Sequence, residues 1–90
     1  MFRMWGKVFH NNHLIMDHVI EKPDPHESRT HKVFQSLEEL AHQFDLPVPI
    51  WLDSNIKDFK RSSKTRFCQD SFVEPIDFDY LEIQIIEEDW

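Results

Sequence analysis

The apolar residues of this chain follow two different periods, which predict where strands give way to helices. Residues 2–22 place apolar side chains on either side of Asn11-Asn12, and asparagine tolerates the left-handed backbone of a two-residue turn. We therefore predict a β-hairpin over these residues. Apolar residues fall on both faces of its second arm, which indicates either a central strand or a surface covered by another subunit.

Pro23 and Pro25 cannot continue a strand or a helix, so they predict a loop. A helical period follows this loop. Ser28 or Thr30 is suited to cap the helix, and Pro47 prevents its extension past Leu46. Apolar residues then recur every three or four positions and form one stripe, namely Val33, Phe34, Leu37, Leu40, Ala41 and Phe44.

The second half of the chain predicts a shorter helix between strands. Residues 50–52 are apolar and indicate a short buried strand, after which Asp53 or Ser54 can cap a helix that turns Ile56 and Phe59 inward. Residues 67–73 indicate another strand, which would bury the thiol of Cys68.

The last predicted strand begins near residue 76 and alternates strictly. Leu81, Ile83 and Ile85 belong to its core face, and Glu82 belongs to its solvent face. The order of elements indicates an α+β fold, a two-layer domain in which a β-hairpin is followed by two helices packed on one face of a mainly antiparallel sheet. We expect residues 1–90 to form a single small domain, and a small open barrel is the alternative architecture.

Composition narrows the functional classes. Apolar residues make up 40% of the chain, enough for a folded core, but the core of a 90-residue domain is thin, so a homodimer that buries more apolar area is plausible. A net charge of −7 argues against a general nucleic-acid binder. Cys68 stands alone, which fits a reducing compartment, and neither a leader nor a membrane-length apolar run is evident. We expect a cytoplasmic protein that does not contact membranes.

The candidate binding residues are five cations that lie along the second predicted helix and just beyond it, namely Lys57, Lys60, Arg61, Lys64 and Arg66. The first four are spaced to form one stripe on a helix, and the stripe shortens if the helix stops near Arg61. The stripe is open to three interpretations: a solvated helix face, a surface for an anionic partner protein, or a site for single-stranded nucleic acid, since Phe59 and Phe67 bracket it.

The acidic end of the chain offers a counterpart to these cations. Residues 74–90 contain seven carboxylates and no lysine or arginine. They fit an edge strand protected by charge, or a strand that lies against the basic residues of the same chain or of a dimer mate. Trp90 is either disordered or docked against a partner.

No constellation of residues predicts catalysis or a cofactor. His10, His13, Asp17 and His18 do not have the spacing of a known zinc site, and Asp17 and His18 point to opposite faces of a strand. We therefore predict a non-enzymatic module that contacts another protein, with self-association as the first candidate. The alternative is a nucleic-acid-associated accessory protein that uses the cations of residues 57–66.

Overall fold

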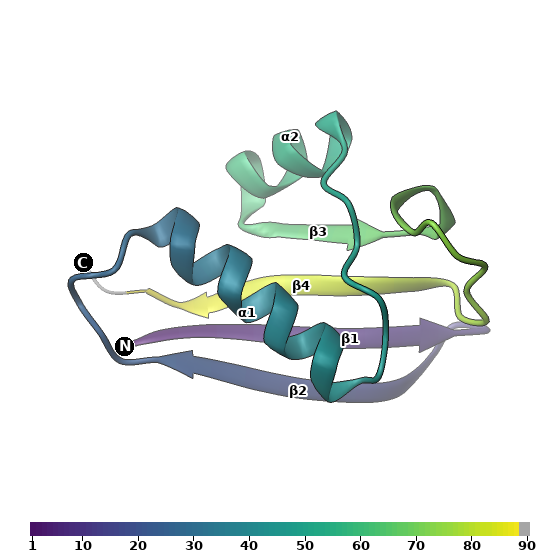
Figure 1. The fold of residues 1–90 in the computed structure, drawn as a ribbon, viewed down its shortest axis with the longest axis horizontal. Helices are drawn as coiled ribbons and strands as arrows, with labels where there is room; N and C mark the ends of the chain where they lie inside the picture. The colour runs from purple at the N-terminus through teal and green to yellow at the C-terminus, as the bar shows by residue number, and fades with distance from the viewer. Residues whose placement is uncertain (89–90) are drawn as a thin grey trace.

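Four antiparallel strands form one sheet in the computed structural model, which describes residues 1–88. The strands are β1 (Phe2–His10), β2 (His13–Lys22), β3 (Lys64–Phe67) and β4 (Tyr80–Glu87), in the order β2-β1-β4-β3. The two helices, α1 (Arg29–Gln43) and α2 (Asp53–Ser62), pack against this sheet. Figure 1 shows α1 lying diagonally across the sheet, over β1 and β2, with α2 beside β3. The predicted α+β class is confirmed.

The β1–β2 hairpin forms as predicted. Asn11 and Asn12 take positive φ angles of 51° and 65°, which is the backbone that a tight turn between twisted strands requires. The register places Val8 opposite Met16 and Phe9 opposite Leu14, so β2 carries one extra residue at a bulge. β2 lies at the edge of the sheet, and the expectation of a central strand for this arm is therefore wrong.

Helix α1 begins where its cap predicts. The Ser28 hydroxyl accepts a hydrogen bond from the His31 backbone N–H at 3.1 Å. A Cβ added at Gly6 would lie 2.7 Å from a methyl carbon of Leu40, which shows that the helix passes very close to β1. Glycine at this strand position thus permits the close contact between helix and sheet. Phe34 departs from the predicted apolar stripe, because its side chain is 47% exposed.

The start of α2 differs from the prediction. Its N-cap is Leu52, not Asp53 or Ser54, and the side chain of Asn55 reaches back to accept the Leu52 backbone N–H at 3.0 Å. Residues 50–52 form no strand, and Ile50 is exposed. Trp51 is half-buried and makes edge-to-face contacts with three rings, those of Phe34, Phe59 and Phe67.

The strand predicted for residues 67–73 is also wrong. β3 instead covers Lys64–Phe67, and a 3₁₀ turn, η1 (Gln69–Ser71), follows at once. The chain leaves the sheet after Phe67, so Cys68 gains no neighbouring strand and is exposed rather than buried. Thr65 and Phe67 face the core with 2% and 0% exposure.

β4 occupies the centre of the sheet, between β1 and β3, and is not the charge-protected edge strand that its acidic sequence indicates. Leu81 and Ile83 are fully buried beneath the helices and Ile85 packs against this core, as predicted. Glu82 is only 4% exposed, which corrects the expectation that it faces solvent. The strands β1 and β3 flank β4, and their side chains Lys7 and Arg66 enclose the Glu82 carboxylate.

Candidate interaction surface

The sheet has a second face, on the side away from the core, and we call it the helix-free face. Side chains alternate along a strand, so the residues between the core residues of each strand point to this face. They form a row across all four strands: Trp5, Lys7 and Phe9 of β1, Asp17 and Val19 of β2, Tyr80, Glu82 and Gln84 of β4, and Lys64 and Arg66 of β3. Both helices within residues 1–88 lie against the opposite face.

A buried carboxylate stands at the centre of the helix-free face. One oxygen of Glu82 lies 2.6 Å from the Lys7 ammonium, and the other accepts a hydrogen bond from Arg66 Nε at 3.0 Å. The side chains of Lys7 and Glu82 are 11% and 6% exposed, whereas that of Arg66 is 58% exposed. A carboxylate with both oxygens paired to cations is well compensated for its loss of water.

Two opposing effects act on the ionisation of Glu82. Burial by itself would raise its pKa, but hydrogen bonds from Lys7 and Arg66, together with their positive charges, outweigh burial and hold the pKa below its ordinary value of 4.5. The hydrogen bond to Glu82 in turn raises the pKa of Arg66 above its already high value. Both groups are therefore ionised at neutral pH.

This arrangement predicts a pH dependence of stability. The depressed pKa means that the stabilisation from ionised Glu82 is fully present above pH 4.5 and is lost as the pH falls through the lower folded pKa. We expect the Glu82→Gln variant to be less stable than the wild type at pH 7, with the difference shrinking below pH 4.5. Urea unfolding of both proteins at several pH values measures this difference. A gap that stays constant down to pH 3 would contradict the assignment.

Aromatic rings flank this charge network. The Lys7 ammonium lies 4.0 Å from the Trp5 ring centre, and the Arg66 guanidinium lies 4.6 Å from that of Tyr80. Phe9 stacks on Tyr80 with the ring centres 5.0 Å apart. The Trp5 indole N–H donates to Asp17 at 3.0 Å, which links the network to β2. The helix-free face is thus an ordered surface, held by contacts between residues far apart in sequence.

The edge of the sheet formed by β2 exposes several apolar side chains. β2 has ten residues, and only β1 pairs with it among the described residues. Four of its large apolar side chains are exposed by between 36% and 50%: Leu14, Ile15, Met16 and Val19. Met16 lies opposite Val8 on the core side, whereas Val19 lies opposite Trp5 on the helix-free face. Apolar exposure therefore occurs on both sides of the strand.

The five candidate cations do not form one stripe. Helix α2 ends at Ser62, and Ser63 adopts a left-handed backbone with φ of 55°. The first three cations, Lys57, Lys60 and Arg61, lie on α2, whereas Lys64 and Arg66 lie on β3.

Acidic neighbours already engage two of these cations. Arg66 contacts Glu82, and Arg61 lies 3.1 Å from Asp58, one helical turn away. Of the acidic end, Glu87 pairs with Arg3 and Glu88 with Arg29, so the last carboxylates of the described chain lie away from the predicted stripe. Trp90 lies outside the described residues.

The histidines are arranged along the hairpin without converging. His10 lies opposite His13, Asp17 lies opposite Lys7, and His18 lies opposite Gly6. Within residues 1–88, no three His, Cys, Asp or Glu side chains gather closely enough to hold a metal ion. No helix in the described chain is both long and apolar enough to cross a membrane.

Sequence reasoning missed the central pair of the helix-free face. Lys7 is the one charged residue between Trp5 and Phe9, and Glu82 stands between Leu81 and Ile83. A charge flanked by apolar residues in each of two strands is a signal for a buried pair. The partner of each charge becomes evident only from the β1–β4 pairing, which places Lys7 opposite Glu82.

Comparison of the chain with family models, curated proteins and solved structures finds no match.

Proposed function

We propose that this protein is a small, non-enzymatic interaction module that self-associates through the free edge of β2. The observation that carries this proposal is the set of exposed apolar side chains on both sides of β2, a ten-residue strand whose outer edge pairs with no strand of residues 1–88. An exposed strand edge is a ready template for pairing with another strand, and apolar residues along it strengthen that tendency.

The distribution of apolar residues favours pairing of edges over stacking of faces. Stacking of two helix-free faces would cover Val19 and leave Met16 exposed on the other side of the sheet. Antiparallel pairing of β2 with the same strand of a second copy covers side chains on both sides at once. It also obeys two-fold symmetry, which is the commonest arrangement of homodimers. The product is a continuous eight-stranded sheet.

Charge limits how this edge can pair. β2 also carries the charged residues Asp17, Glu21 and Lys22, and the bulge interrupts the strand near Ile15. Charges and bulges discourage pairing with arbitrary strands, so they favour a partner whose charges are complementary. Because β2 carries acidic and basic groups, a second copy in antiparallel orientation can supply such charges.

Substitution of one exposed apolar residue on each side of β2, namely Met16 and Val19, tests the proposal. We expect the wild type to sediment with a mass approaching twice the chain mass of 11.0 kDa at high concentration. The variant Met16→Lys/Val19→Lys should remain monomeric, because two unpaired ammonium groups in an apolar interface cost several kcal/mol. Sedimentation velocity across a concentration series measures both.

A matched control separates edge pairing from general surface stickiness. Val73 lies outside the strands and is 87% exposed, so Val73→Lys should leave the mass unchanged. A wild type that stays monomeric up to about millimolar concentration would overturn the proposal, since specific dimers normally associate below that range. So would an equal effect of Val73→Lys.

Nucleic-acid binding through Lys57, Lys60, Arg61, Lys64 and Arg66 is the competing proposal. The break at Ser63 and the pairing of Arg61 and Arg66 with acidic groups leave it fewer free charges than the sequence predicts. The variant Lys60→Glu/Arg61→Glu should lose nucleic-acid binding if this alternative holds and should keep the dimer mass if edge pairing holds.

A further inference from the structure

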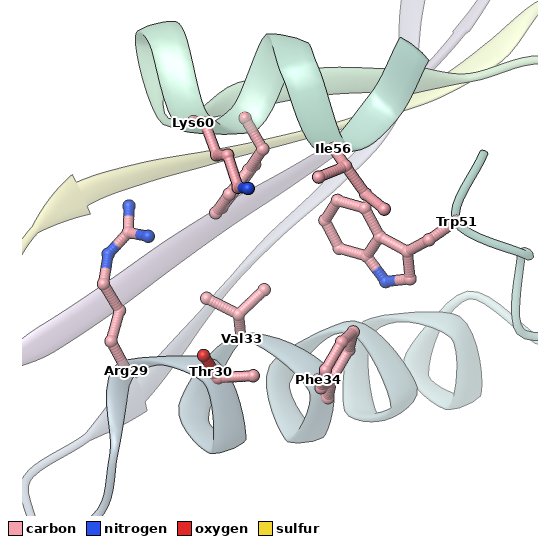
Figure 2. Close-up of a pocket in the computed structure, with 8 residues that line it drawn as sticks. Arg29, Thr30, Val33, Phe34, Trp51, Ile56 and Lys60 are labelled. Carbon is pink, nitrogen blue, oxygen red and sulfur yellow. The ribbon is translucent and has the colours of Figure 1, made fainter. Parts of the chain in front are cut away.

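A groove of about 260 Å³ opens between α1 and α2, on the opposite side of the sheet from the helix-free face. Its walls are mostly apolar and are formed by Val33 and Phe34 of α1, by Trp51, and by Ile56 and Phe59 of α2. In Figure 2, Trp51 lies at one end of the groove, and Arg29 and Lys60 extend from the two helices at the other. The groove therefore has an apolar body and a cationic end.

The charge of this groove differs from that of the whole chain. No carboxylate is among its lining residues within residues 1–88, although the protein carries a net charge of −7. Lys60 makes no ion pair within that range and is exposed. Arg29 lies over the Phe59 ring at 5.4 Å and donates a hydrogen bond to the Ser63 hydroxyl at 3.1 Å. Lys60 can therefore meet an anionic group that enters the groove, whereas Arg29 also pairs with Glu88 of the same chain.

The apolar rim is exposed on both sides. Phe34 is 47% exposed and Ile56 is 40% exposed, and Figure 2 shows them on different helices with the Trp51 ring between them. Phe34 belongs by its spacing to the buried stripe of α1, yet the groove leaves its ring uncovered. An aromatic ring exposed at the mouth of a groove gains contact area when a bulky side chain inserts beside it.

A carboxylate of the same chain already occupies part of the cationic end. Glu88, just beyond β4, forms an ion pair with the Arg29 guanidinium. Glu88 belongs to the same chain, and its contact shows that a carboxylate just beyond the end of a strand reaches the Arg29 guanidinium. Arg29 is on the first turn of α1, while Lys60 is on the last turn of α2, so a second acidic residue could engage Lys60.

We propose that this groove binds an acidic segment of a partner protein, with a bulky apolar side chain inserted between the helices and carboxylates at Arg29 and Lys60. The groove is open and smaller than most pockets that enclose a small molecule, so it suits one large side chain of a longer chain. With two cations at one end of a strongly acidic protein, it suits a few carboxylates better than a phosphate backbone.

Titration of the full-length ¹⁵N-labelled protein with a defined peptide tests this proposal. The probe is acetyl-Glu-Glu-Phe-Leu-Glu-Glu-amide, with one control peptide in which Ala replaces Phe and Leu and another in which Lys replaces Glu. We expect saturable shifts of the Trp51 indole N–H signal and of the Phe34 and Ile56 amide signals. The dissociation constant should lie near 10⁻⁴ M, with both control peptides at least about tenfold weaker.

Two charge reversals on the same helix provide a matched pair of variants. Lys60→Glu should weaken binding of the probe by about tenfold, because it places a carboxylate at the cationic end. Lys57→Glu makes the same charge change on α2, but Lys57 is not among the lining residues, so its effect should stay within about twofold. Both side chains are exposed, and unchanged dispersion of the remaining amide signals would show that each variant folds.

Several results would overturn the proposal. These are absence of shifts at the groove with millimolar probe, equal binding of either control peptide, and equal effects of the two reversals. Stronger shifts of the same signals by phenylacetate or by oligothymidylate would assign the groove to a small acid or to nucleic acid instead. The variant Met16→Lys/Val19→Lys should bind the probe as the wild type does, so this result stands apart from self-association.

Discussion

Replacing Glu82 by leucine should lower the free energy of unfolding by about 3–5 kcal/mol, which is the usual cost of leaving one member of a buried ion pair without its partner. This variant leaves the Lys7 side chain, which is only 11% exposed, without its carboxylate partner. Its remaining contacts are the Gln84 side-chain oxygen at 3.4 Å and the Trp5 ring. Neither carries a full negative charge.

The double variant Lys7→Met/Glu82→Leu separates the cost of an orphaned charge from the value of the pair. Because it removes both charges together, we expect it to recover most of the lost stability. Urea unfolding followed by tryptophan fluorescence, at one fixed protein concentration, measures all variants. Glu87→Gln is the control on the same strand, since Glu87 is 47% exposed and pairs with Arg3 at the surface. It should change stability by less than about 1 kcal/mol.

The outcome bears directly on the helix-free face. If Glu82→Leu costs no more than Glu87→Gln, the Lys7 side chain is solvated and the pair does not order the helix-free face. A large cost with recovery in the double variant would show that the cost comes from the orphaned Lys7 charge, and a double variant as unstable as Glu82→Leu would show that the pair itself orders this face.

Replacing Asn55 by alanine should lower the free energy of unfolding by about 2–4 kcal/mol, because buried polar groups would lose their partners. Asn55 is 4% exposed and makes four hydrogen bonds. Its amide nitrogen donates to the Thr65 hydroxyl at 3.0 Å and to the Arg66 carbonyl at 2.9 Å. Its oxygen accepts the Leu52 backbone N–H at 3.0 Å and the Ser71 hydroxyl at 3.4 Å.

Asn55→Asp tests the donor half of this role. Aspartate keeps an acceptor for the Leu52 N–H, but its second oxygen faces the Arg66 carbonyl oxygen, so we expect it to be at least as destabilising as alanine. The control is Ser54→Ala, since Ser54 is the exposed preceding residue of α2 and should change stability by no more than about 0.5 kcal/mol. Urea unfolding measures each variant. If Asn55→Ala is as mild as Ser54→Ala, the link between α2, β3 and η1 does not depend on this side chain.

Features set by neighbouring residues could be predicted from the sequence. The Asn11-Asn12 turn, the Ser28 cap of α1 and the alternation of Leu81, Ile83 and Ile85 each depend on a few consecutive residues and their backbone preferences. The α+β class followed from the order of these local elements. The predictions of a strand at residues 50–52 and of a buried Cys68 are wrong because short apolar runs do not distinguish a strand from an irregular segment.

The candidate sites depended on contacts that local patterns do not contain. Alternation identified two faces of β4 but not the strands beside it, so Glu82 was placed in solvent although Lys7, 75 positions earlier, lies opposite it. The left-handed turn at Ser63 likewise moved Arg66 from a helix face to the sheet.

The sequence by itself thus determined the hairpin, the two helices, β4 and the class of fold, because backbone preference and periodicity act over a few residues. Tertiary structure decided which charges are buried, which edge is free and where a groove opens, because strand order and helix position arise from packing between distant segments.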